Sequence, residues 1–225
     1  EAARLKKIIF HPQMLPAQVI LDPVLSKDLP PALTAATGMD AIAHCMETFM
    51  AAPFNPPADG IGLDGLQRAW AHIERATLNG QDKEARMHLM SASMQGAMAF
   101  QKGLGCVHSL SHSLGGVNPR LHHGTLNAMF LPAVVQFNAS AESVQKENRL
   151  NRMAQVMGLS SGSDIPQAIQ DMSARLGLPN GLAAMGVTTS MFDAIVHGAM
   201  ADHCHKTNPR IATPEEYKEM LAASM

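Results

Sequence analysis

Methionine recurs every three or four residues between Lys83 and Gln101, with alanines among the remaining apolar positions: the recurring residues are Met87, Met90, Met94 and Met98. This period matches the α-helix and predicts a buried helix. The whole chain has the same character, since it is 46% hydrophobic but only 4% aromatic and contains 17 methionines. Small and flexible apolar side chains suit close helix packing, whereas strands favour Val, Ile, Thr and aromatic residues. The composition therefore favours a mainly α-helical bundle over a β sandwich.

Local signals place further helices along most of the chain. They are expected over residues 33–50, 63–77, 126–137, 143–157, 165–176, 191–203 and 214–223, and residues 53–60 are expected to form a loop. Pro132 predicts a kinked or interrupted helix. The only convincing strand material is a short β segment near the start, at residues 7–10 and 17–21, where Ile and Val stand between proline turns.

Charge and cysteine content exclude several classes of protein. The net charge of -2 comes without a clustered basic stretch, so no nucleic-acid partner is expected. The three cysteines are odd in number and far apart, which predicts no disulfide framework and a cytoplasmic location. No apolar run reaches the roughly 18 residues of a membrane span, so no membrane partner is expected. The chain starts without Met and soon becomes apolar, and we therefore expect it to be a fragment of a longer protein.

Asp40 and His44 lie four residues apart in an otherwise apolar predicted helix, and so share one face. An isolated pair of this kind is usually just a solvated ion pair. In an apolar helix, however, burying an aspartate without a cation would cost several kcal/mol, roughly. A bound cation is the simplest compensation.

Four histidines fall between Gly103 and Gly124. His108 and His112 share a helix face, and His122 and His123 follow a Gly-Gly and Asn-Pro break that turns the chain back. Two core histidines satisfied by carbonyl groups are the alternative for the first pair. Together with Asp40 and His44, the better account is a metal site of three imidazoles and one carboxylate, completed by His108 and His123. These ligand types favour Fe(II) or Zn(II) over Mg(II) or Ca(II).

The segment Asp202-His203-Cys204-His205 also contains metal-binding residue types. Consecutive His-Cys-His residues cannot surround one ion tetrahedrally without strain, so a structural or pocket-lining role is favoured over a second metal site.

Several motifs together resemble the iron-containing (group III) alcohol dehydrogenases. The similarity runs in order from about residue 7 to the end, through Asp22-Pro-Val-Leu, Leu33-Thr-Ala-Ala-Thr-Gly-Met-Asp-Ala-Ile-Ala-His44, Gly103-Leu-Gly-Cys-Val-His-Ser-Leu-Ser-His112, His123-Gly124 and Thr207-Asn-Pro-Arg210. The resemblance implies the dehydroquinate synthase-like helical domain of that family, here residues 31–225. Residues 1–30 would be the end of an amino-terminal nucleotide-binding α/β domain and its connector.

Carried over residue by residue, the family's metal ligands fall on Asp40, His44, His108 and His123. A further histidine near the nicotinamide falls on His112, and Phe100 would lie beside the nicotinamide and substrate pocket. The loop before His123 is one residue longer than in most members, so His122 is the alternative ligand. The Gly124 that follows favours His123.

The resemblance implies an NAD- or NADP-dependent alcohol dehydrogenase or aldehyde reductase with a small substrate, acting as a homodimer. The glycine-rich phosphate-binding turn of the nucleotide domain is absent from these 225 residues, so the chain would supply only the metal-binding half. Alternatives are a non-catalytic helical module for metal binding or dimerisation, and another dehydroquinate synthase-like enzyme such as a glycerol dehydrogenase.

Overall fold

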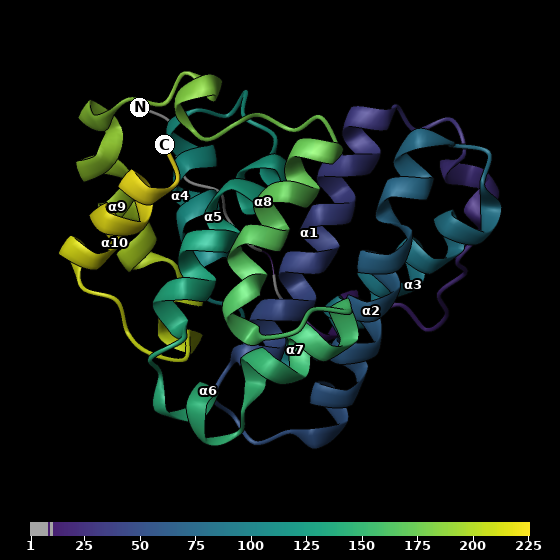
Figure 1. The fold of residues 1–225 in the computed structure, drawn as a ribbon, viewed down its shortest axis with the longest axis horizontal. Helices are drawn as coiled ribbons and strands as arrows, with labels where there is room; N and C mark the ends of the chain where they lie inside the picture. Colours follow the sequence, from purple (N-terminus) through teal and green to yellow (C-terminus); the bar gives the residue numbers. More distant parts are fainter. Residues whose placement is uncertain (1–8, 10) are drawn as a thin grey trace.

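The computed structural model describes residues 9 and 11–225, and within them it contains ten α-helices and no β-strand. The helices are α1 Pro31–Met50, α2 Pro56–Leu78, α3 Lys83–Met98, α4 Cys106–Val117, α5 His123–Asn138, α6 Glu142–Lys146, α7 Arg149–Met157, α8 Ile165–Arg175, α9 Phe192–Ala201 and α10 Pro214–Ala223 (Figure 1). The predicted helical bundle is confirmed. None of the helices in the described ranges is both long enough and apolar enough to cross a bilayer.

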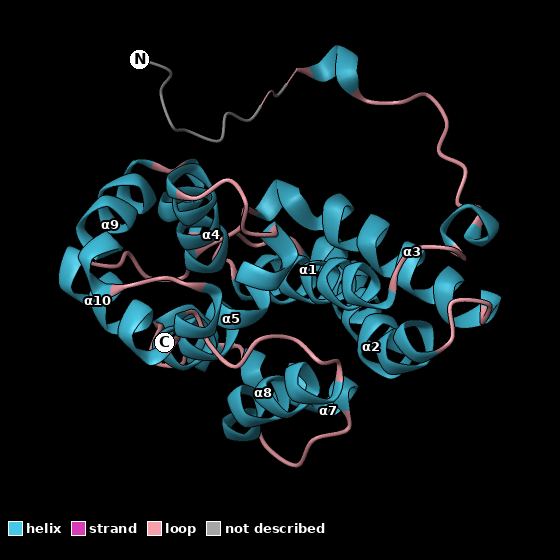
Figure 2. Ribbon diagram, turned by 90° about the horizontal axis from the view of Figure 1, so that it is seen from above, coloured by secondary structure: helices cyan, strands magenta, loops and turns pink. Residues whose placement is uncertain are grey.

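Helix α1 is the centre of the bundle, with most of its side chains buried. It packs against α2 and α3 on one side and against α5 on another, while α9 packs against α4 and α10. In Figure 2, α2 and α3 lie at one end of the bundle, and α4, α9 and α10 lie at the other. Helices α7 and α8 lie beside the bundle, between these ends. Ala, Met, Ile and Cys side chains supply the core of α1, as the composition predicts. Polar residues on such a helix therefore face protein on most sides.

The predicted strand at residues 17–21 is wrong: these residues have no regular structure, and Val19 and Ile20 are exposed. A strand needs a neighbouring strand to satisfy its backbone groups, and none is present in the described residues. The other predicted strand, at residues 7–10, lies outside the described residues apart from Ile9. Figure 2 shows the described part of the amino-terminal arm outside the bundle, and its short 3-10 helix at Pro23–Ser26 contacts α3.

The expectation that the methionine stripe is buried is also wrong. Helix α3 forms, but Met87 and Met98 are exposed, and Met90 and Met94 are half-buried. Beside buried Arg86, its buried residues are the small Ala85, Ala92 and Gly96. These three residues are each two positions from a methionine of the stripe, which is about 200° around a helix. A Cβ on Gly96 would lie only 2.8 Å from Cβ of His44. Close approach to α1 selects the smallest side chains, so the methionines occupy the opposite face.

Beyond shifts of a few residues at helix ends, three features differ from prediction. Helix α2 begins at Pro56, inside the predicted loop, because the Asn55 side chain accepts a hydrogen bond from the Ala58 amide and proline is favourable at a first helical position. The helix predicted over 143–157 is divided into α6 and α7, since Asn148 adopts a left-handed conformation with φ of 52°. Helix α5 continues through Pro132 without interruption.

Candidate metal centre

Asp40 and His44 extend from the middle of α1 toward His108 of α4 and His123 of α5. The Asp40 Oδ1 atom lies 3.7 Å from His44 Nε2, 3.7 Å from His108 Nε2 and 3.6 Å from His123 Nε2. Tetrahedral bonds of about 2.0–2.2 Å would place ligand atoms about 3.3–3.6 Å apart. The separations from Asp40 are therefore those of ligands on a single ion, and one atom each of Asp40, His44 and His108 lies within 4.8 Å of the others, while His123 is placed by its contact with Asp40. One carboxylate with imidazoles is a donor set that favours Fe(II) or Zn(II) over Mg(II).

The side-chain amide of Asn127 lies among the same atoms. Its Nδ2 is 2.5 Å from Asp40 Oδ1 and 3.2 Å from Nε2 of both His108 and His123, while its buried Oδ1 has no hydrogen-bond partner. A positively polarised N–H group thus contacts three of the four predicted ligands. The Asn127 amide thus marks a place among these side chains where positive charge is favourable. Asn127 follows His123 by one turn of α5, so the two side chains lie on the same face of that helix.

Two carboxylates surround His108. Burial alone would lower its pKa, but hydrogen bonds with Asp40 and with Glu47, which lies 2.5 Å from Nδ1, raise the pKa to about 9. Burial would raise the pKa of Asp40, but the hydrogen bond with His108 and the nearby imidazoles hold it well below its usual value. The raised pKa of His108 and the lowered pKa of Asp40 both indicate a site that favours positive charge, whether it comes from a proton or from a metal ion.

Glu47 was not recognised from the sequence, and it connects the fold to the site. Its Oε1 accepts a hydrogen bond of 2.8 Å from the Val107 amide at the start of α4, and its Oε2 faces His108 Nδ1. Helix α4 has no side-chain cap of its own, so Glu47 and Asn208, which accepts from Cys106, satisfy its first amides. With the proton on Nδ1, Nε2 of His108 has its lone pair available for a metal.

Replacing Glu47 with glutamine is expected to weaken metal binding by about 10–100-fold, as is typical when a group that orients a metal-binding histidine is removed. The glutamine oxygen can still accept from Val107, but its NH₂ group then faces His108 Nδ1 and favours a proton on Nε2 instead. Competition with a chromogenic chelator measures the change in affinity. Exposed Glu84 on α3 gives the control, E84Q, which should bind like wild type. Equal affinities for E47Q and wild type would contradict this role.

Gly124 permits the close approach of α5 to α1. A Cβ at this position would lie 2.2 Å from the Ala36 carbonyl oxygen and 3.2 Å from Asp40 Cβ. No rotation of a side chain could relieve the first contact, because the neighbour is backbone. The glycine therefore brings His123 within reach of Asp40, and the exposed side chain of His122 is not part of the cluster.

The structure also places the two residues predicted to lie near a nicotinamide. The ring of His112 stacks on His123 with centroids 5.3 Å apart, and its Nδ1 is 3.0 Å from Asp202 Oδ2. The Phe100 ring contacts His44 edge to face at 4.7 Å and is 38% exposed. Both residues therefore border the cluster. The partnership of His112 with Asp202 was not predicted, and their separation in sequence gives no signal for it.

Comparison with known proteins agrees with this geometry. Residues 34–225 match the model of the Fe-containing alcohol dehydrogenase family, C-terminal. The chain belongs to the iron-containing alcohol dehydrogenase family. Among family members, it is 60% identical over 225 residues to a 4-hydroxybutyrate dehydrogenase of Cupriavidus necator, covering 98% of this chain and 59% of that protein. It is 36% identical to alcohol dehydrogenase 4 of Saccharomyces cerevisiae, covering 96% and 56%.

Solved structures of family members share the fold. The chain matches a 1,3-propanediol oxidoreductase with a TM-score of 0.84 and 30% identity, covering 91% of this chain and 55% of that one. It matches the iron-containing alcohol dehydrogenase of Thermococcus thioreducens with a TM-score of 0.85 and 26% identity, covering 96% and 56%. The chain thus spans little more than half the length of the relatives it matches.

Proposed function

We propose that this chain is the metal-binding half of an NAD- or NADP-dependent alcohol dehydrogenase or aldehyde reductase. The observation that carries the proposal is the placement of three imidazole nitrogens 3.6–3.7 Å from one oxygen of Asp40. Asp40, His44, His108 and His123 would hold Fe(II) or Zn(II), which supplies a Lewis acid for an alcohol or carbonyl oxygen, while a nicotinamide supplies or accepts the hydride.

His112 and Phe100 would shape the space beside that ion. The hydrogen bond to Asp202 fixes the His112 ring and places a proton on Nδ1, so that Nε2 is its basic nitrogen. We propose that His112 orients the nicotinamide or relays a proton at this nitrogen. Phe100, packed on His44, would limit the pocket on the other side. We propose a small alcohol or aldehyde as the substrate class, in keeping with the names of the relatives given above.

The remaining features of the proposal concern the whole protein. Residues 31–225 would form the helical metal-binding domain, and residues 1–30 the end of a nucleotide-binding domain and its connector. That domain would be a partner supplied by sequence outside these 225 residues, and the whole protein would act as a homodimer. The three cysteines are all free and buried, which supports a reducing, cytoplasmic compartment. Membership of the family favours this enzyme over a non-catalytic metal-binding module.

The test is pyridine-nucleotide-linked turnover by the full-length protein that carries this chain, loaded anaerobically with Fe(II) or Zn(II). 4-Hydroxybutyrate, 1,3-propanediol and methanol are suitable first substrates, because relatives at 60%, 32% and 32% identity bear those names. We expect turnover that disappears on chelation and returns with metal. Turnover that persists in the stripped enzyme would contradict metal dependence, and loaded enzyme that is inactive on all short alcohols and aldehydes would contradict the activity.

A further inference from the structure

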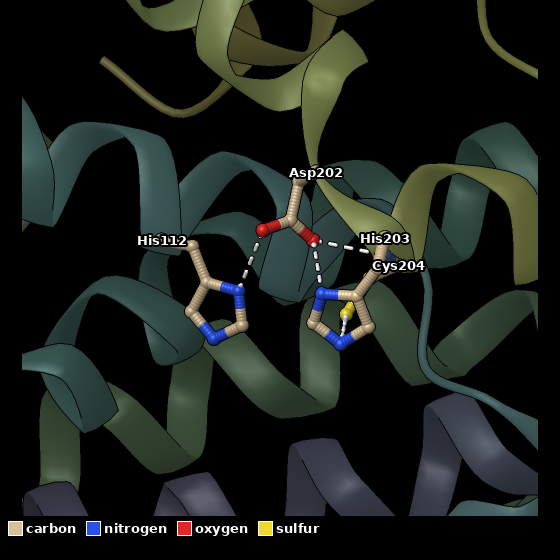
Figure 3. A group of neighbouring side chains, drawn as sticks. All are labelled: His112, Asp202, His203 and Cys204. Atoms are coloured by element: carbon tan, nitrogen blue, oxygen red, sulfur yellow. Dashed lines mark hydrogen bonds and ion pairs between the residues drawn. The ribbon is translucent and has the colours of Figure 1, made fainter. Parts of the chain in front are cut away.

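A second group of metal-binding side chains lies next to the first. Figure 3 shows the Asp202 carboxylate between the imidazole rings of His112 and His203, with the Cys204 sulfur beside His203. His112 comes from α4, whereas the other three follow the end of α9 directly. One nitrogen, oxygen or sulfur atom from each of the four lies within 4.8 Å of the others.

The individual contacts join the four side chains in a row through both carboxylate oxygens of Asp202 and both ring nitrogens of His203, so small side-chain rotations would bring one atom of each residue to a common ion. His112 Nδ1 is 3.0 Å from Asp202 Oδ2, His203 Nδ1 is 3.5 Å from Asp202 Oδ1, and Cys204 Sγ is 3.3 Å from His203 Nε2. Zinc bonds of about 2.0–2.3 Å to nitrogen, oxygen and sulfur place tetrahedral ligand atoms about 3.3–3.8 Å apart. His203 is 61% exposed, so its ring can turn to present either nitrogen and gives an ion access from solvent.

The fold resolves the objection that three consecutive residues cannot surround one ion. His205 Nδ1 instead contacts the Tyr217 hydroxyl at 2.9 Å, which removes His205 from the group. In its place the fold supplies His112 from a distant part of the chain and the carboxylate of Asp202. The ligands then come from two elements: the exposed His203 ring would turn to present one nitrogen, and His112 and Asp202, now 3.0 Å apart, would separate slightly.

The turn that holds Asp202, His203 and Cys204 is fixed at several points. The Cys204 amide donates to Asp202 Oδ1 at 2.8 Å, and the Thr207 hydroxyl bonds to the carbonyl oxygens of Cys204 and Leu104. The second of these bonds ties the turn to the segment that leads into α4. His112 and Cys204 are buried and Asp202 is only partly exposed, so three of the four donor residues are held in place before any ion binds.

Charge at the group favours a divalent cation. Burial would raise the pKa of Asp202, but hydrogen bonds from His112 and the Cys204 amide keep the pKa below its usual value, so the carboxylate is charged. Burial and the negative charge of Asp202 raise the pKa of the Cys204 thiol. Without metal the thiol keeps its proton, and an ion that binds the sulfur releases this proton to solvent.

We propose that His112, Asp202, His203 and Cys204 form a second metal site, specific for zinc or another thiophilic divalent ion. The sulfur ligand distinguishes it chemically from the Asp40 site, whose four predicted ligands contain no sulfur. An ion at this site would replace the Nδ1 proton of His112, so that Nε2 carries the ring proton in the metal-bound state, and would tie α4 to the turn after α9.

Cobalt titration of the full-length protein that carries this chain, stripped with chelator and kept anaerobic, tests the proposal. A Co(II) ion bound by thiolate has a sulfur-to-metal charge-transfer band in the near ultraviolet, and the Asp40 site cannot produce one. We expect the band in wild type and in D40N. The C204S variant should lose the band, and it should also bind one equivalent of cobalt fewer than wild type. H203A should weaken the band-forming site by at least about tenfold, the loss seen even for groups that only support a ligand.

Two controls make the result decisive. Exposed His197 on α9 and buried Cys106 on α4 lie outside the group, so H197A and C106S should keep the band. Because His203 is at the surface, H203A tests the site even if C204S fails to fold. A wild-type chain that binds cobalt without the band, or a band that survives in both C204S and H203A, would overturn the proposal.

Discussion

Replacing Asp59 with asparagine is expected to destabilise the domain by about 3–5 kcal/mol, the cost of leaving buried charge without its partner. Asp59 of α2 accepts a hydrogen bond from Lys102 Nζ, and its Oδ1 also lies 3.7 Å from Arg149 Nη1. Both cations are buried, and both donate to the Phe49 carbonyl near the end of α1. Asparagine keeps the shape but removes the only carboxylate that neutralises Lys102 in the described contacts.

Urea unfolding of D59N and wild type measures this cost. The matched control is D64N on the same helix, where Asp64 pairs with Arg68 and both side chains are more than one-third exposed. A solvent-exposed pair contributes at most about 1 kcal/mol, so D64N should change little. Burial already lowers the pKa of Lys102, and loss of Asp59 should lower it further. Equal losses of stability in D59N and D64N would show that the buried network is not specially important.

Replacing Asp40 with asparagine is expected to abolish stable iron binding. The substitution keeps the size of the side chain but removes the charged ligand and the negative charge that faces three imidazoles. Loss of a ligand should exceed the roughly 10–100-fold effect of losing a supporting group. Anaerobic loading with Fe(II), removal of free metal and elemental analysis should give about one iron per wild-type chain and almost none for D40N.

The control for this experiment is D171N, at an exposed position on α8 whose carboxylate contacts Gln167. Its iron content should equal that of wild type. Circular dichroism should show folded protein in all three samples, since Asp40 is partly exposed and lies in a helix that is otherwise well packed. A folded D40N chain that retains its iron would refute the assignment of Asp40 as a ligand.

The sequence predicted helices and the clustering of histidines well, because both depend on local spacing. Asp40 and His44 share a face whatever the tertiary fold, and Gly124 indicated which of two adjacent histidines would lie inward. Glu47 was missed although the signal was present: it is an acidic residue seven positions after Asp40 on an apolar helix. The argument that buried aspartate needs a cation applies equally to this glutamate.

Long-range packing explains what could not be predicted. The periodicity of α3 identified a stripe of methionines, but periodicity alone cannot tell which face of a helix is buried. Contact with α1 selected Ala85, Ala92 and Gly96 instead. Similarly, Asp202 and His112 are 90 residues apart and meet only because α9 packs on α4. The missing strand had the right composition but no neighbouring strand in the described residues.

The division of the first site among three helices makes a bound ion a cross-link. An ion held by His44, His108 and His123 would close two loops of the chain, as a disulfide does, and so reduce the entropy of the unfolded state if the ligands stayed attached. If the unfolded chain releases the ion, mass action adds about 2.7 kcal/mol of stability at a free metal concentration one hundred times Kd. In both cases α4 and α5 are held on α1 by coordination as well as by packing, and thermal stability becomes a measure of metal occupancy.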